Sequence, residues 1–268
     1  MTLSAHAVTD AGIELARRRK AGLHGPRLPE TCRPADLTDA LAIQRQVSRH
    51  MGDTVGAFKC GTPTDDRVVV APIYSGTIST ASPCPVWAQN GQVRVEPELA
   101  FVLGRDLPAR EQAYSQAEIE SAIHKVHLAL ELIDSRYDDQ AELTFADRLA
   151  DGLVNQGLWL GPEVPWQQAR QAQAFAVEWS AGEGAVTTLT GRHPNDNPLL
   201  PLYWLVEHLR ATGQGLQAGQ VVICCSVTPF WRWLLTSRPL PPHWSHGRGA
   251  VPGFAPEPWH VGQLAGRS

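Results

Sequence analysis

The strongest constraint on this chain is a pair of acidic residues inside a segment that is otherwise typical of a buried β-strand. The segment reads VRVEPELAFVL from Val93 to Leu103, and it carries Glu96 and Glu98. Side chains at positions i and i+2 of a strand lie on the same face of the sheet, so the two carboxylates should point the same way. The continuous apolar run after Glu98 indicates a strand covered on both faces. The fold must therefore place two carboxylates together in a partly buried position.

A solvated strand face is the ordinary explanation for two glutamates at this spacing, and the apolar context argues against it. Two ionised carboxylates about 4 Å apart repel each other by roughly 4 kcal/mol at an effective dielectric constant near 20. A partly buried pair therefore needs a cation nearby, or one carboxylate must stay protonated. Pro97 lies between the two glutamates and cannot donate a backbone hydrogen bond. This predicts a sheet edge or an interruption of the sheet beside the pair.

A third carboxylate, Glu131, also stands in an apolar run, LALELI at residues 128–133. A charged residue at the end of a helix or strand is commonplace, so Glu131 alone indicates little. Three acids without a histidine or cysteine partner would form a set of hard oxygen ligands. Such a set suits Mg²⁺, Mn²⁺ or Ca²⁺ rather than zinc.

Helices and strands are mixed along the chain without the regular alternation of a parallel βαβ fold. Apolar spacing predicts helices at 3–21, 36–51 and 198–213, and a helix that runs into a strand at 115–132. Asp36 is a plausible N-cap, and SQAE at 115–118 is a possible capping box. Strands are expected at 55–61, 93–103, 156–161, 174–180, 184–191 and 219–227, and a loop that enters a strand at 71–78. Several of these strands are joined by short turns, which predicts an α+β fold.

The end of the chain differs in composition from the rest. Residues 229–268 hold seven prolines, four of the nine tryptophans and a single acid, Glu257. Each proline removes a backbone donor from a sheet, so we expect mostly irregular structure there, with the tryptophans packed on the domain or on a neighbouring subunit. We therefore divide the chain into an N-terminal helical segment (1–65), a β-rich core expected to hold the functional site (66–228) and a Pro/Trp-rich tail (229–268).

Composition and charge argue against several classes of protein. The formal net charge of −4 provides no basic field for nucleic acid. No apolar run reaches the roughly 18 residues that would cross a membrane, and the N-terminus lacks the order of a signal peptide. The five cysteines are odd in number and show no CxxC spacing, so neither a disulfide framework nor a zinc site is indicated. We expect a cytoplasmic protein that binds neither nucleic acid nor membrane.

The same segments resemble a known family. VEPELAFVLGRDLP, LALELIDSR and LADGLVNQG are similar to the 2-keto-4-pentenoate hydratase and 4-oxalocrotonate decarboxylase group of the fumarylacetoacetate hydrolase superfamily. The similarity covers most of residues 10–228 and includes LTDALAIQRQV, GAFKCGTP and PLLPLYWLVEHLRATGQGLQAGQVV. It implies a mixed β-sandwich or β-roll core with an N-terminal helical segment packed on it.

The resemblance also implies a metal centre and catalytic residues. Matched by position, Glu96, Glu98 and Glu131 would bind one Mg²⁺ or Mn²⁺ ion. Lys59 and Asp151 would be catalytic, with Lys59 donating to an oxyanion or relaying a proton. The ordinary alternatives are a surface lysine at a strand end for Lys59 and a capping or turn role for Asp151.

Four further residues would contact the substrate if the resemblance holds: Gly76, Ser135, Arg136 and Asn155. Gly76 would let the backbone approach the ligand, although it could equally serve a turn. Structural pairing is the alternative for Ser135 and Arg136, and a turn or capping role is the alternative for Asn155.

The activity implied by the resemblance is that of a hydratase in aromatic catabolism. It would add water to a 2-hydroxy-2,4-dienoate and give a 4-hydroxy-2-oxo acid. A decarboxylase acting on a 2-oxo-3-enedioate of the 4-oxalocrotonate type would use the same enolate stabilisation, so the metal ligands do not separate the two. The unusual composition of residues 229–268 leaves a third hypothesis open, a catalytically inactive paralogue. The expected partners are a small 2-oxo or 2-hydroxy-dienoate and further copies of the chain in a homo-oligomer.

Overall fold

A computed structural model describes residues 2–81, 84–88, 92–139, 141–172, 174–179, 187–193, 195, 197–224, 231–234 and 249–250. The helices are α1 (Ala5–Ala21), α2 (Leu37–Met51), α3 (Gln116–Ala122), α4 (Phe145–Ala150), α5 (Trp166–Arg170) and α6 (Leu200–Ala211). The strands are β1 (Val55–Cys60), β2 (Val70–Tyr74), β3 (Ile78–Ser79), β4 (Pro85–Val86), β5 (Gln92–Leu103), β6 (Ile123–Ile133), β7 (Asn155–Glu163), β8 (Ala174–Trp179), β9 (Thr187–Arg192), β10 (Val221–Cys224), β11 (Trp231–Leu234) and β12 (Gly249–Ala250). The mixture of helices with mainly antiparallel strands agrees with the expected α+β class.

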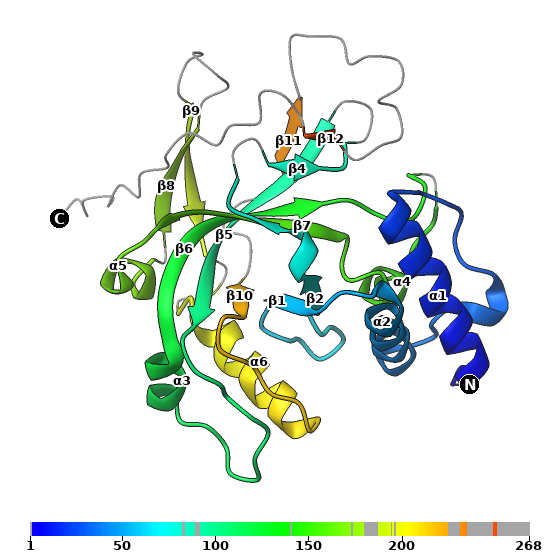
Figure 1. The fold of residues 1–268 in the computed structure, drawn as a ribbon, viewed down its shortest axis with the longest axis horizontal. Helices are drawn as coiled ribbons and strands as arrows, with labels where there is room; N and C mark the ends of the chain where they lie inside the picture. Colours follow the sequence, from blue (N-terminus) through cyan, green and yellow to red (C-terminus); the bar gives the residue numbers. More distant parts are fainter. Residues whose placement is uncertain are drawn as a thin grey trace.

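One large sheet organises the fold. Its strand order is β2-β1-β10-β5-β6-β7-β3, and β11 pairs with β5 in addition. The pairs β1–β10 and β3–β7 are parallel, whereas β5 runs antiparallel to both β6 and β10. A single 3₁₀ turn, Ser75–Thr77, joins β2 to β3, although these strands stand at opposite ends of the order. The sheet therefore curls until it is nearly closed, and the long, bent strands β5 and β6 form its wall (Figure 1).

The inner face of this curled sheet carries a cluster of apolar side chains. Its buried members are Ala57, Ile73, Ala100, Ala129, Leu158, Val221 and Ile223. They come from β1, β2, β5, β6, β7 and β10, and strands as far apart in the order as β2 and β7 can share one cluster only inside the curve. The three alanines leave room on this face for larger polar side chains.

Helices α1 and α2 form a separate layer beside β1 and β2 (Figure 1). They pack on each other and on α4 through a second apolar cluster that includes Leu15, Ile43 and Leu149. Gln44 ties α2 to the rest of the molecule, since its Nε2 donates to the carbonyl oxygens of Val70 and Leu149. The predicted N-terminal helices are thus confirmed. None of the helices among the described residues is long and apolar enough to cross a membrane.

Local sequence signals identify the helix starts. The side chain of Asp36 accepts a hydrogen bond from the backbone N–H of Asp39, as expected for an N-cap. Ser115 and Glu118 form the expected capping box at the start of α3. The chain then passes from α3 directly into β6, which confirms the predicted helix-to-strand transition at 115–132.

The sequence predicts a loop that enters a strand at residues 71–78, but the segment begins in a strand, and the next strand starts at Ile78. Val70–Tyr74 form β2 and are buried throughout, and the turn follows at Ser75–Thr77. Pro72 makes the segment resemble a loop in sequence. It is tolerated because β2 is the terminal strand of the order formed by the described residues, so its outer flank requires no donor in that order.

The described part of the tail contains two short strands. β11 pairs antiparallel with β5, and β12 pairs with β4. The expectation of irregular structure is therefore wrong for these residues. For β11 the physical reason is local, because residues 230–238 contain no proline and keep all their backbone donors. Trp244 and Trp259 lie outside the described residues, and the packing of the four tryptophans stays a prediction, as do the three domain boundaries.

Candidate metal centre

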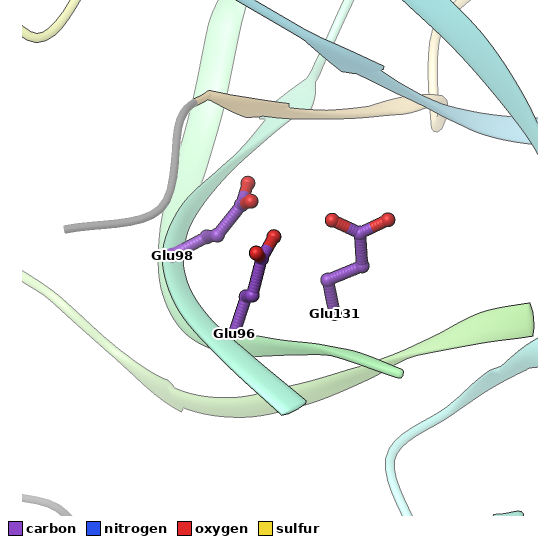
Figure 2. Close-up of side chains that lie close together, drawn as sticks. All are labelled: Glu96, Glu98 and Glu131. Carbon is purple, nitrogen blue, oxygen red and sulfur yellow. The ribbon is translucent and has the colours of Figure 1, made fainter. Parts of the chain in front are cut away.

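Strand register brings the three predicted ligands together. In the β5–β6 pair Glu96 lies directly opposite Glu131, and Glu98 lies opposite Ala129 on the same face. One carboxylate oxygen from each glutamate lies within 4.8 Å of the others. Figure 2 shows the three carboxylates directed into one common space. All three residues are buried, so the solvated strand face is excluded.

Among the described residues, β5 changes its partner strand beside the glutamate pair. On the flank away from β6, β5 pairs with β10 through residues 99–102 and with β11 through residues 92–95. Among the described residues, 96–98 therefore lie between two partner strands, and the residues that join β10 to β11 are not described. Pro97, which has no N–H to donate, stands at the centre of these three residues. The predicted sheet edge is wrong, because β5 is an inner strand, and the interruption stays a prediction.

Lys59 reaches Glu131 from β1, three positions away in the strand order. Its position on β1 is in register with Ile223 of β10, which is in register with Ala100 of β5, so Lys59 shares the inner face. Its Nζ donates to Oε2 of Glu131 at 2.7 Å, and its side chain is 12% exposed. Burial opposes the charge of Lys59, but Glu131 and the other two carboxylates outweigh burial and raise its pKa. Lys59 is therefore a charged ammonium beside the acids, and the surface-lysine alternative is wrong.

Asn155 holds the other oxygen of Glu131. Its Nδ2 donates to Glu131 Oε1 at 2.9 Å, so both oxygens of this carboxylate have a donor. Asn155 follows a turn in which Gly152, Leu153 and Val154 all have positive φ, at 73°, 52° and 60°. Such a conformation is rare for a leucine and an outlier for a β-branched valine, and costs on the order of 1–3 kcal/mol for each residue. The fold accepts this strain next to a residue that orients a candidate ligand.

The charges of the cluster fit a divalent cation. Burial, and next the charge of Glu131, raise the pKa of Glu96 to about 7 and raise the pKa of Glu98 well above its ordinary value. Glu98 Oε2 is buried and has no hydrogen-bond partner among the residues that the structure describes. When all three glutamates are ionised, Lys59 offsets one of three negative charges and two remain. Oxygen donors, an unpartnered carboxylate oxygen and a residual double negative charge are the properties that Mg²⁺, Mn²⁺ or Ca²⁺ would satisfy.

The raised pKa of Glu96 predicts how pH affects stability. Without metal, folded Glu96 keeps its proton up to about pH 7, whereas its ordinary pKa is 4.5. The folded state then binds more protons than the unfolded state, so stability should fall as pH rises from about 5 to about 8. Mg²⁺ binds the ionised carboxylates of the folded state, so it should raise Tm more at about pH 8 than at about pH 5. Melting curves with Mg²⁺ or with a chelator test this; an equal Mg²⁺ effect at both pH values contradicts it.

The other predicted site residues contact protein groups. Arg136 Nε donates to Asp151 Oδ1 at 2.6 Å, and the backbone N–H of Arg136 donates to Asp151 Oδ2. Ser135 Oγ accepts from the N–H of Tyr137. The N–H of Gly76 donates to Asp53, and Gly76 also lines a cavity of about 150 Å³. The described residues therefore bring Lys59 and Asn155 to the carboxylates. Substrate contacts by Gly76, Ser135, Arg136 and Asn155 stay predictions, as do the catalytic roles of Lys59 and Asp151.

Sequence reasoning missed one buried residue next to this set. Arg19 of α1 donates through Nη1 to the carbonyl oxygen of Asn155 and through Nη2 to that of Asp151. Its only sequence signal is a place in the basic run RRRK at 17–20, where a surface cluster at a helix C-terminus is the ordinary interpretation.

Comparison with known proteins confirms the resemblance. The chain is 29% identical over 230 residues to a 2-keto-4-pentenoate hydratase of Burkholderia vietnamiensis. The aligned region covers 80% of this chain and 86% of that protein. It is 28% identical over 142 residues to a 4-oxalocrotonate decarboxylase of a Pseudomonas species, half the length of each. No family model matches the chain. Several curated relatives thus carry the name of a hydro-lyase.

The fold also has a solved counterpart. A structure of 4-oxalocrotonate decarboxylase from Pseudomonas putida G7, complexed with magnesium and adipate, superposes with a TM-score of 0.66. The match covers 87% of this chain and 92% of that chain at 15% sequence identity. At this identity the match shows that the two chains share a fold.

Proposed function

We propose, on the premise that this chain is a homologue of the 2-keto-4-pentenoate hydratases and of 4-oxalocrotonate decarboxylase, that it is a metal-dependent hydratase. It would add water to a 2-hydroxy-2,4-dienoate and release a 4-hydroxy-2-oxo acid. The observation that carries the proposal is the buried cluster of Glu96, Glu98 and Glu131 with Lys59 beside it. Long sequence matches to proteins named as hydratases support this choice of reaction.

The side chains of the cluster suit an acidic, oxygen-rich substrate. A divalent cation held by Glu96, Glu98 and Glu131 would supply Lewis-acid stabilisation of negative charge on the substrate oxygens. Lys59 is positioned to donate a hydrogen bond to a developing oxyanion or to deliver a proton, because its ammonium is charged and largely shielded from water. Asn155 fixes the orientation of Glu131. We propose that the enzyme uses Mg²⁺ or Mn²⁺.

A decarboxylase is the second candidate, and the sequence match to a protein named 4-oxalocrotonate decarboxylase supports it. The reaction would start from a 2-oxo-3-enedioate and would need the same stabilisation of an enolate. Both reactions can therefore use the same three carboxylates and the same lysine. The tail keeps an inactive paralogue as the third outcome of the test.

An ultraviolet assay separates the three outcomes. Purified protein is incubated with 2-hydroxypenta-2,4-dienoate or with 2-oxohex-3-enedioate, in Mg²⁺ and in chelator. We expect Mg²⁺-dependent loss of the dienol absorbance with formation of 4-hydroxy-2-oxopentanoate. Release of carbon dioxide from the enedioate would instead identify a decarboxylase. Protein that binds Mg²⁺ but converts neither compound would be an inactive paralogue.

A further inference from the structure

A buried arginine of the N-terminal helix lies behind the candidate metal centre. Arg19 is 7% exposed although it belongs to the basic run at the end of α1. Its two terminal nitrogens donate to two backbone carbonyl oxygens, those of Asp151 at 2.8 Å and Asn155 at 2.7 Å. The guanidinium also lies over the ring of Tyr74, 5.6 Å from its centroid. Arg19 therefore bridges two points of the chain four residues apart.

Those two points are the ends of the strained turn. Between Asp151 and Asn155 the chain passes through Gly152, Leu153 and Val154, all with positive φ. Gly152 makes the approach possible, because a Cβ there would lie 3.0 Å from Arg19 Nη2. A turn with two non-glycine residues in this conformation needs support from outside its own backbone.

The far end of the turn carries the residue that orients a candidate ligand. Asn155 accepts from Arg19 through its backbone oxygen and donates to Glu131 through its side chain. The path from α1 to the carboxylate cluster therefore consists of two direct hydrogen bonds. We propose that Arg19 is a positioning residue, which clamps the turn at 151–155 so that Asn155 is presented to Glu131. The proposal rests on the proposed metal centre.

The clamp requires an arginine for a geometric reason. A guanidinium offers several donors in a rigid planar fork, so it can hold two carbonyl oxygens at once, whereas the ammonium of lysine is a single point. Burial, and next the charge of Arg136, lower the pKa of Arg19 to about 10, so the fork stays charged at neutral pH. The acidic groups of Asp151 and Asp134 favour the charge.

The test is a double-mutant cycle read out as Mg²⁺ affinity by calorimetry. The variants are Arg19→Met, Asn155→Ala and the combination of both, each checked for folding by circular dichroism. Loss of a residue that orients a metal ligand typically weakens metal binding about 10- to 100-fold. We expect such a loss for Asn155→Ala, about a tenfold loss for Arg19→Met, and no further loss when Arg19→Met is added to Asn155→Ala. Arg17→Met is the matched control, because Arg17 is an exposed arginine of the same helix.

The outcomes separate this proposal from the proposed function. If the unmodified protein does not bind Mg²⁺, the metal centre itself is wrong. If it does, an unchanged affinity in Arg19→Met, or losses that multiply in the double variant, overturns the clamp. Should Arg19→Met fail to fold, Arg19→Lys replaces it in the cycle. A Mg²⁺ affinity of Arg19→Lys between those of the unmodified protein and Asn155→Ala supports the clamp. An unchanged Mg²⁺ affinity overturns it.

Discussion

Replacing Glu98 with glutamine should abolish Mg²⁺ binding and leave the chain folded. The substitution keeps the size of the side chain and removes one of three negative charges. It also turns one of the two terminal oxygens into an amide nitrogen, which is not a ligand for this ion. We expect the affinity measured by calorimetry to fall by more than about 100-fold, beyond the typical effect of residues that only orient a ligand. Glu98 is buried with a raised pKa, so the metal-free variant should be at least as stable as the unmodified protein.

Glu163→Gln provides the matched control for this experiment. Glu163 is an exposed residue at the end of β7, paired with Lys125 on the surface. Its replacement changes the net charge by the same amount, so its Mg²⁺ affinity should equal that of the unmodified protein. Unaltered Mg²⁺ binding by the Glu98 variant would remove Glu98 from the metal centre.

Replacing Lys59 with methionine should lower turnover by about 100-fold or more, since removal of one donor to an oxyanion typically costs roughly 3–4 kcal/mol. Mg²⁺ affinity should not fall, because the Lys59 ammonium competes with a metal ion for the same carboxylates. Steady-state rates at saturating Mg²⁺, together with calorimetry, test both statements.

Lys125→Met is the corresponding control, as it removes a lysine whose partner is the exposed Glu163. Its turnover should match that of the unmodified protein. If Lys59→Met also keeps full turnover, Lys59 is only a structural counter-ion of Glu131.

The sequence was informative wherever a feature is local. The period of two in a strand placed Glu96 and Glu98 on one face, and the structure confirms it. Capping residues identified the starts of α2 and α3. Residues 71–78 show where local reasoning fails, because the proline that makes them resemble a loop is harmless in a terminal strand. Strand order is a property of the whole sheet, and no short segment encodes it.

The long-range part of the site could not be derived from residue patterns alone. Glu131 is opposite Glu96 only because β5 and β6 pair in one particular register. Lys59 reaches Glu131 only because β10 inserts between β1 and β5. For both residues the family resemblance supplied the assignment. It supplied nothing for Arg19, whose burial depends on how α1 packs against a turn more than a hundred residues away.

The insertion of β10 between β1 and β5 also bears on how the chain folds. Strands β5 and β6 are close in sequence and can pair early, but this places Glu96 directly opposite Glu131, and like charges across a strand pair are destabilising. The Lys59 ammonium, which compensates this repulsion, is on β1, and β1 joins β5 through β10. Residues 221–224 of β10 are synthesised after all the other residues of the cluster. Repulsion between Glu96 and Glu131 should therefore oppose the pairing of β5 with β6 until β10 and β1 are in place. Mg²⁺ in the folding medium would relieve that repulsion, so the rate of refolding should itself depend on the metal ion.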